Sequence, residues 1–187
     1  GREEVSGEGL ALFPGVIDLH VHLNEPGRAE WEGFASGSSA FAAGGGTTLG
    51  DMPLNSSPPV TNLAAFRAKV AAAERSCCTD FALWAGLVPG NVGEMAELAE
   101  AGALGFKAFL CDSGLDEFPA VDGQTLYDGM REAAALGLPV AVHAEDSHLL
   151  ALHAAELERG DVAGYLASRP VQAEVAAVKL ALAAARE

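Results

Sequence analysis

Short apolar runs alternate with longer amphipathic segments along most of the chain. The apolar runs are rich in aliphatic and β-branched residues, which is typical of buried strands. They predict five strands, over residues 15–23, 47–52, 81–88, 105–110 and 138–145. The intervening segments have apolar positions at helical spacing and predict helices over residues 30–44, 62–75, 92–102 and 123–137. From residue 147 onward the pattern is helical, with breaks at Gly160 and at Arg169-Pro170.

This alternation predicts an α/β fold whose parallel strands are joined by right-handed crossovers. A doubly wound open sheet and part of an eight-stranded barrel both fit the periodicity. The polar residues favour the barrel, because the active sites of barrels lie at the C-terminal ends of the strands. Four polar residues fall at or near such ends: His20, His22, Lys107 and His143. No dinucleotide or phosphate-loop glycine motif occurs, and the glycines at 44–46 precede a strand, which indicates a turn. We therefore predict a partial TIM (β/α)8 barrel made of its first five strand–helix units.

The composition is strongly acidic. Lys and Arg number 11 against 26 Asp and Glu, which gives a formal net charge of -15. Such a chain is repelled by nucleic-acid phosphates and anionic lipid, so neither is an expected partner. No apolar run approaches the roughly 18 residues of a membrane span, and the first twelve residues lack the pattern of a secretory signal. We expect a cytoplasmic protein that acts on a small molecule.

The cysteines do not suggest a disulfide framework. They are Cys77, Cys78 and Cys111, an odd number with two adjacent in the chain. A reducing compartment is the simplest interpretation. No second cysteine pair exists to complete a tetrahedral metal site, so we interpret all three as packing residues.

His20 and His22 give the strongest local signal for chemistry. Residues two apart on a strand project to the same side, so both imidazoles can reach one metal ion. The alternative is a pair of polar side chains on a half-exposed strand edge. The flanking residues are apolar: Val16, Ile17, Leu19 and Leu23. They predict a buried strand, in which unpartnered imidazoles would be costly, and this favours metal binding.

Two further residues extend this set. Lys107 lies within the apolar strand GFKAFL (105–110), where desolvation favours the neutral amine. A neutral amine reacts with carbon dioxide to form a carbamate, an anionic ligand with two oxygens that can bridge two cations. A lysine whose ammonium reaches water is the ordinary alternative. His143 ends the strand LPVAVHAE (138–145), where it is either a third metal ligand or a hydrogen-bonded core histidine.

The order of these residues resembles the cyclic amidohydrolases of the amidohydrolase superfamily. FPGVIDLHVHLNEPGRAEWEGF (13–34) is similar to the opening motif of that family, in which Asp-x-His-x-His precedes Glu-Pro-Gly. GFKAF (105–109) resembles the segment that carries the family's carbamylated lysine, and AVHAE (141–145) resembles that of its third histidine ligand. YLASRPVQAE (165–174) is similar to a helical Ser-Arg-Pro segment of allantoinases and hydantoinases. The resemblance covers the chain from about residue 13 to its end.

The resemblance implies a binuclear metal centre. Two divalent ions, usually zinc in this family, would be held by His20, His22 and His143 and bridged by the carbamate of Lys107. The resemblance also implies a homo-oligomer, typically a homotetramer. It assigns residues 13–187 to the barrel and residues 1–12 to a linker or to the remnant of a preceding β-sandwich.

Within the family, the motifs most resemble those of allantoinases, which open the ring of allantoin to give allantoate. Dihydroorotases carry His-x-His-x-Arg, whose arginine grips a substrate carboxylate. Asn24 stands at that position here, and an amide suits a neutral ureide ring better. The family's Met-Pro-Asn motif appears as MPLNS (52–56), with one extra residue before Asn55. We therefore expect Asn24 and Asn55 to bind substrate.

Two parts of the family's catalytic machinery have no counterpart in this sequence. These are a fourth histidine ligand on the sixth strand and a general-base aspartate at the end of the eighth strand. Residues 144–187 have a helical pattern instead. We therefore expect this chain to be a segment of a longer enzyme. Dihydroorotase or hydantoinase (dihydropyrimidinase) activity is one alternative, and a non-catalytic relative that keeps the fold is another.

Overall fold

All strands of the computed structural model are parallel and follow one another in chain order. The structure describes residues 4, 6–158 and 160–187. One sheet has the order β1 (Val16–Val21), β2 (Gly46–Asp51), β3 (Asp80–Leu83), and the other has the order β4 (Ala85–Gly86), β5 (Phe106–Phe109), β6 (Val140–His143). A doubly wound sheet would reverse this order at a switch point. Uninterrupted sequential order is instead that of a barrel wall.

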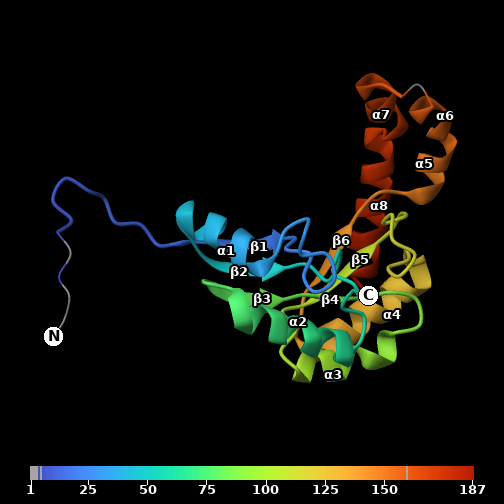
Figure 1. The fold of residues 1–187 in the computed structure, drawn as a ribbon. Helices are drawn as coiled ribbons and strands as arrows, with labels where there is room; N and C mark the ends of the chain where they lie inside the picture. Colours follow the sequence, from blue (N-terminus) through green and yellow to red (C-terminus); the bar gives the residue numbers. More distant parts are fainter. Residues whose placement is uncertain (1–3, 5, 159) are drawn as a thin grey trace.

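The third predicted strand is interrupted at Trp84, and its two halves join the two sheets. The backbone N–H of Trp84 donates to Asp51 O at 3.0 Å, on the side of β2. The next residue, Ala85, donates to Gly105 O at 3.0 Å, on the side of β5. The strand therefore passes from one neighbour to the other, and Figure 1 shows β1 to β6 as one curved layer.

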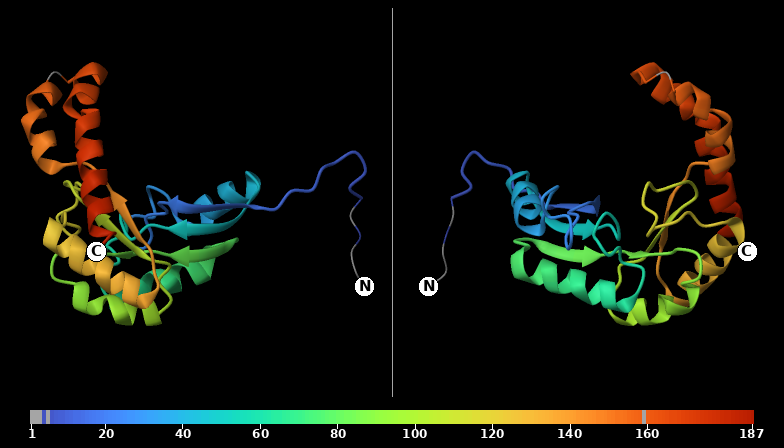
Figure 2. Two further views of the ribbon diagram at one scale, coloured as in Figure 1. Left: turned by 180° about the vertical axis from the view of Figure 1, so that it is seen from behind. Right: turned by 45° about the vertical axis from the view of Figure 1, so that its right-hand side comes forward.

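The helices between the strands form an outer layer in the same order. They are α1 (Phe34–Ala43), α2 (Leu63–Ser76), α3 (Met95–Glu100), which follows the 3-10 turn η1 (Val92–Glu94), and α4 (Gly123–Leu136). The side chain of Asn62 accepts from Ala65 N and caps α2, and Asp122 accepts from Thr125 N and caps α4. Each helix contacts the next one along the chain, so α2, α3 and α4 line the outer side of the curve (Figures 1 and 2).

The C-terminal quarter of the chain is helical, as predicted. It contains α5 (Ser147–Leu152), α6 (Ala154–Leu157), α7 (Val162–Ser168) and α8 (Val171–Ala184). Arg169 and Pro170 separate α7 from α8, because proline cannot continue a helix that precedes it. Helices α5 to α7 project away from the sheet, whereas α8 runs back to pack beside α4 (Figure 1). None of the described helices is long and apolar enough to cross a lipid bilayer.

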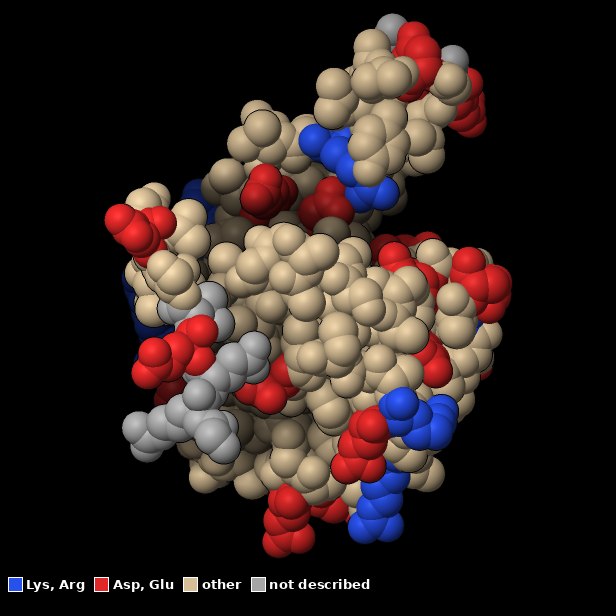
Figure 3. Space-filling model, turned by 60° about the vertical axis from the view of Figure 1, so that its left-hand side comes forward, with Lys and Arg blue, Asp and Glu red and all other residues tan. Residues whose placement is uncertain are grey.

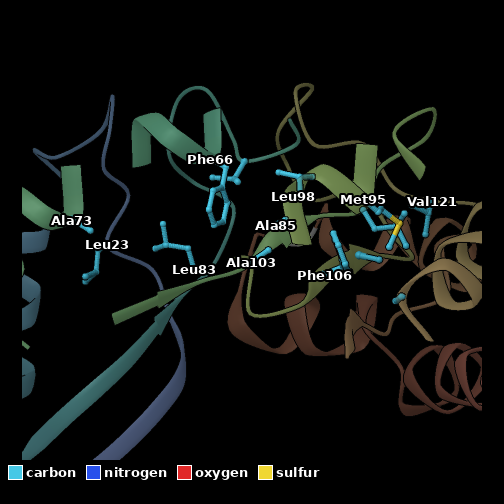
Figure 4. Packing of buried hydrophobic residues seen from close by; sticks show 14 of the residues in the cluster. Leu23, Phe66, Ala73, Leu83, Ala85, Met95, Leu98, Ala103, Phe106 and Val121 are labelled. Carbon is cyan, nitrogen blue, oxygen red and sulfur yellow. The ribbon is translucent and has the colours of Figure 1, made fainter. Parts of the chain in front are cut away.

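The core lies between the sheet and the outer helices. Phe66 from α2, Met95 from α3 and Phe106 from β5 are among its fully buried members, and Figure 4 shows their side chains directed into one layer. Such burial is the main stabilising contribution of an α/β layer. The face shown in Figure 3 has a broad central region without charged side chains, and both acidic and basic groups lie around it.

The prediction that the first strand is buried is wrong. Val16 is 55% exposed and Ile17 is 63% exposed, because β1 pairs only with β2 among the described strands. The exposure ends at Leu23, which is buried. Residues 4 and 6–15 form no helix or strand and are exposed, while residues 1–3 and 5 lie outside the described part of the chain. The assignment of residues 1–12 to a linker or sandwich remnant stays a prediction.

Candidate metal centre

A cavity of about 520 Å³ opens at the carboxyl ends of the strands. It is lined by His20 from β1, Lys107 from β5 and His143 from β6, together with the segment around Arg169. Three of the four residues expected to hold metal therefore meet in one cavity, although they lie far apart in sequence. This is the end of a parallel barrel wall at which polar side chains of different strands converge.

His22, the fourth expected ligand, lies beside His20 just beyond the end of β1. Their ring centroids are 5.6 Å apart. Nδ1 of His22 lies 2.9 Å from the carbonyl oxygen of Leu54. Since a carbonyl only accepts, Nδ1 carries the proton and Nε2 keeps its lone pair. Metal-binding histidines show this arrangement, because a bond to the second nitrogen fixes the tautomer and the direction of the ring.

Lys107 is 4% exposed, and no described carboxylate pairs with its amine. Burial alone lowers the pKa of Lys107 below its ordinary value. Nζ lies 5.3 Å from the centroid of the Phe109 ring, so an aromatic face stands beside the amine. A partly desolvated amine of lowered pKa has the chemistry that carbamate formation requires.

His20 is held toward its neutral form. His20 is exposed on β1, so the expected burial of its imidazole is wrong. Partial desolvation nevertheless lowers its pKa first, and the positive charges of Lys107 and His22 lower it further, against the opposing effect of Asp18. His143 also lowers the pKa of His20. The four groups are thus close enough to influence one another. A neutral imidazole is the form that binds a cation, so this environment fits a metal ligand.

His143 has well-defined partners on two sides. Its ring stacks on Phe109 with centroids 4.7 Å apart and planes 9° from parallel. Its Nε2 donates to Glu145 Oε2 at 2.7 Å, and Glu145 in turn accepts from Arg169 Nη1 at 2.9 Å. Burial acts to raise the pKa of Glu145, but the hydrogen bonds from His143 and Arg169 outweigh it and leave the pKa lowered. Glu145 is therefore ionised at neutral pH.

The prediction from sequence assigned no role to Glu145 or Arg169. Both stand in segments whose resemblance to the family was visible, AVHAE and YLASRPVQAE. Their pairing was not predictable, because it depends on how α7 and α8 return to the edge of the sheet. The only available signal was their position within two conspicuous motifs.

Cys111, His143 and Glu145 form a second group of side chains with metal-ligand chemistry. Their ligand atoms lie within 4.8 Å of one another. Burial and the charge of Glu145 raise the pKa of the Cys111 thiol to about 11, so it stays protonated at neutral pH. A raised pKa disfavours the thiolate, which is the form of cysteine that binds a cation. Cys111 is buried as a packing residue should be, whereas Cys78 is exposed, so that expectation is wrong for Cys78.

Asn24 and Asn55 are brought together, but on loops beside the cavity rather than in its wall. Asn55 Nδ2 donates to Asn24 Oδ1 at 3.3 Å, and Arg28 Nη1 donates to Asn55 O at 2.7 Å. Asn24 is buried and has a φ of 59°, a left-handed conformation that asparagine tolerates better than most residues. The loop of Asn55 contacts His22 through the Leu54 carbonyl. Both loops therefore adjoin the metal-ligand candidates.

A fully buried ion pair lies directly behind these loops. Lys69 Nζ is 2.7 Å from Asp51 Oδ2, and both side chains are completely shielded from solvent. The same Nζ donates to Met52 O at 2.7 Å, while Asp51 Oδ1 accepts from Leu23 N at 2.8 Å. Burial raises the pKa of Asp51 and lowers that of Lys69, each against the attraction of its partner. The pair joins the ends of β1 and β2 to helix α2, and the sequence did not reveal it.

Comparison with known proteins shows the family to which the chain belongs. Residues 9–185 match the family model described as dihydro-orotase-like. The chain belongs to the dihydro-orotase-like family. Among curated members of similar sequence, allantoinase of Solibacter usitatus is 59% identical over 100% of this chain, which spans 41% of that protein. Allantoinase of Rubrobacter xylanophilus is 53% identical over 100% of the chain and 42% of its own length. The expected resemblance to allantoinases is confirmed, and the chain spans about two fifths of the length of these relatives.

The fold of this dihydro-orotase-like chain is also found in solved structures. L-hydantoinase (dihydropyrimidinase) from Arthrobacter aurescens superposes with a TM-score of 0.87 at 38% identity, covering 92% of this chain and 39% of that protein. D-hydantoinase from Bacillus sp. AR9 gives a TM-score of 0.85 at 27% identity, covering 100% of the chain and 42% of that protein. The predicted α/β class is thereby confirmed.

Proposed function

We propose that this chain forms the first five strand–helix units of an eight-stranded barrel and supplies most ligands of its metal centre. The convergence of His20, Lys107 and His143 in one cavity carries the proposal, and His22 stands beside them. Sequential parallel strands with an outer layer of helices support the barrel. The protein that contains this chain would hydrolyse the ring amide of allantoin to allantoate.

The donor set fits two divalent cations of the zinc type. Imidazole nitrogens suit zinc, and a carbamate on Lys107 would offer one oxygen to each of two ions. Such a pair lowers the pKa of water to near 7 and polarises the scissile carbonyl. The residues of this chain would hold the ions: the Leu54 carbonyl fixes His22, and Phe109 fixes the plane of His143. Burial lowers the pKa of the Lys107 amine, which favours its reactive neutral form.

Allantoin is favoured over two neighbouring substrates. The allantoinases of similar sequence support it, whereas the hydantoinases of similar structure support a hydantoin ring as the second candidate. A dihydroorotate carboxylate would need a cation, yet an amide, Asn24, occupies the position of the dihydroorotases' arginine.

We expect the purified full-length protein to contain two divalent ions per subunit and to turn over allantoin in preference to hydantoin and dihydroorotate. Metal analysis and comparison of kcat/KM for the three substrates would test this. A higher kcat/KM for hydantoin than for allantoin would identify the protein as a hydantoinase, the second candidate. A metal-free protein without hydrolase activity would instead indicate a relative that keeps the fold for binding or assembly.

Replacing Asn24 with arginine is expected to impair allantoin turnover by roughly 10- to 100-fold, equivalent to about 1–3 kcal/mol for a misplaced polar group in a binding site. The larger cation would have to enter a buried position of left-handed backbone and would break the contact with Asn55. Steady-state kinetics on allantoin would measure the loss. Asn24→Gly, which tolerates the same backbone, is the control for strain, and an unchanged rate in Asn24→Arg would show that Asn24 does not adjoin the substrate.

A homotetramer and a cytoplasmic location also stay predictions. Light scattering coupled to size-exclusion chromatography of the full-length protein would determine the number of subunits.

A further inference from the structure

A line of three side chains runs from the break between α7 and α8 to the end of β6. Arg169 Nη1 lies 2.9 Å from both carboxylate oxygens of Glu145, and Glu145 Oε2 lies 2.7 Å from Nε2 of His143. Arg169, Glu145 and His143 all line the 520 Å³ cavity rather than the hydrophobic core. The Glu145 carboxylate is the most shielded of the three, with 18% exposure, against 42% for His143 and 40% for Arg169.

This arrangement leaves only one nitrogen of the His143 ring free to bind a cation. An ionised carboxylate only accepts hydrogen bonds, so Nε2 carries the proton and the lone pair of a neutral ring lies on Nδ1. The stacking on Phe109 fixes the ring plane, so the direction of that lone pair is fixed as well. Arg169 Nη1 contacts both oxygens of Glu145 at 2.9 Å, and so holds the carboxylate against rotation.

We propose that Glu145 and Arg169 are positioning residues that hold His143 with Nδ1 presented to a divalent cation. The inference rests on the metal centre proposed above and assigns a role to two residues outside its ligand set. Carboxylates that accept a hydrogen bond from a metal-binding histidine act in this way, and their loss typically costs about 10- to 100-fold in metal affinity or activity.

The test is the affinity of the full-length protein for zinc, measured by competition with a chromophoric chelator. Glu145→Ala is expected to bind one of its two ions about 10- to 100-fold more weakly. Glu145→Gln keeps an oxygen that accepts from Nε2–H, so it should lose less. Arg169→Gln should weaken the same ion, and Arg169→Lys, which retains a cation, should restore part of the affinity. Glu97→Gln, the same change on the exposed face of α3, is the matched control and should bind like the unaltered protein.

The possible results distinguish a failure of the positioning role from a failure of the proposed function. If the unaltered protein binds two ions and Glu145→Ala binds both with the same affinity, the positioning role is overturned while the proposed function stands. If Cys111→Ser weakens zinc as much as Glu145→Ala does, or if the cobalt-loaded protein shows thiolate-to-metal charge transfer, then Glu145 is a ligand together with Cys111 and the inference is wrong. An unaltered protein that binds no zinc overturns both proposals. Should Glu145→Ala fail to fold, Glu145→Gln and Arg169→Gln provide the same comparison.

Discussion

The substitution Lys107→Ala in the full-length protein is expected to abolish allantoin hydrolysis, with kcat lowered at least about 1,000-fold. Without the amine no carbamate forms, and the ligand that would bridge two cations is lost. Electrostatic stabilisation by a metal centre is worth several kcal/mol, and each 1.36 kcal/mol corresponds to a tenfold change in rate. Kinetics and metal analysis of the same preparation would show whether activity and metal are lost together.

The burial of Lys107 makes this substitution informative. The side chain is 4% exposed and has no carboxylate partner among the described residues, so its removal breaks no ion pair. Lys179→Ala is the same replacement on the exposed surface of α8 and should leave the rate unchanged. A short-chain carboxylic acid supplied in the buffer can stand in for the missing carbamate and should restore part of the activity. Near-normal activity of Lys107→Ala without added acid would exclude the bridging role.

Replacing Lys69 with methionine is expected to produce the largest loss of stability among single substitutions near the site. Methionine fills a similar volume but leaves Asp51 buried and without its cation. Removing one partner of a buried pair costs about 3–5 kcal/mol, because the remaining charge has lost its compensation. The midpoint of urea unfolding should therefore fall markedly. Arg67→Met, on the exposed side of the same helix, should change stability by less than about 0.5 kcal/mol.

A second variant separates the charge from the packing. In the double variant Asp51→Leu with Lys69→Met, no uncompensated charge remains, so much of the lost stability should return. The hydrogen bonds to Leu23 N and Met52 O would still be missing. If Lys69→Met unfolds at the same urea concentration as the unaltered protein, then the ion pair does not hold the ends of β1 and β2 to α2.

The strands and helices of this chain were predictable because each apolar run is short and each amphipathic segment ends at a clear signal. Asn62 and Asp122 begin helices where the pattern indicated, and Arg169-Pro170 separates two helices. The interruption at Trp84 was not predictable, because it arises where the strand exchanges β2 for β5. The exposure of Val16 and Ile17 also escaped prediction, since sequence does not show which strand lies at an edge.

The site was predictable to the extent that its residues lie within strands. Parallel strands in sequential order bring their carboxyl ends together, so His20, Lys107 and His143 had to converge if the barrel was right. Partners that come from loops and helix breaks do not follow this rule. Glu145 pairs with Arg169, and Asp51 pairs with Lys69, because of how the connecting segments fold back toward the sheet. Those folding paths cannot be deduced from the hydrophobic pattern.

Because the cavity is lined by residues of both β1 and β6, metal binding there would affect the folding stability of the chain. His20 and His143 are separated by more than half of the chain, and every strand–helix unit lies between them. Two cations joined by the carbamate of Lys107 would link His20 to His143, and so would hold together a long loop that is entropically costly to close. Removal of the metal should therefore lower the stability of the full-length protein.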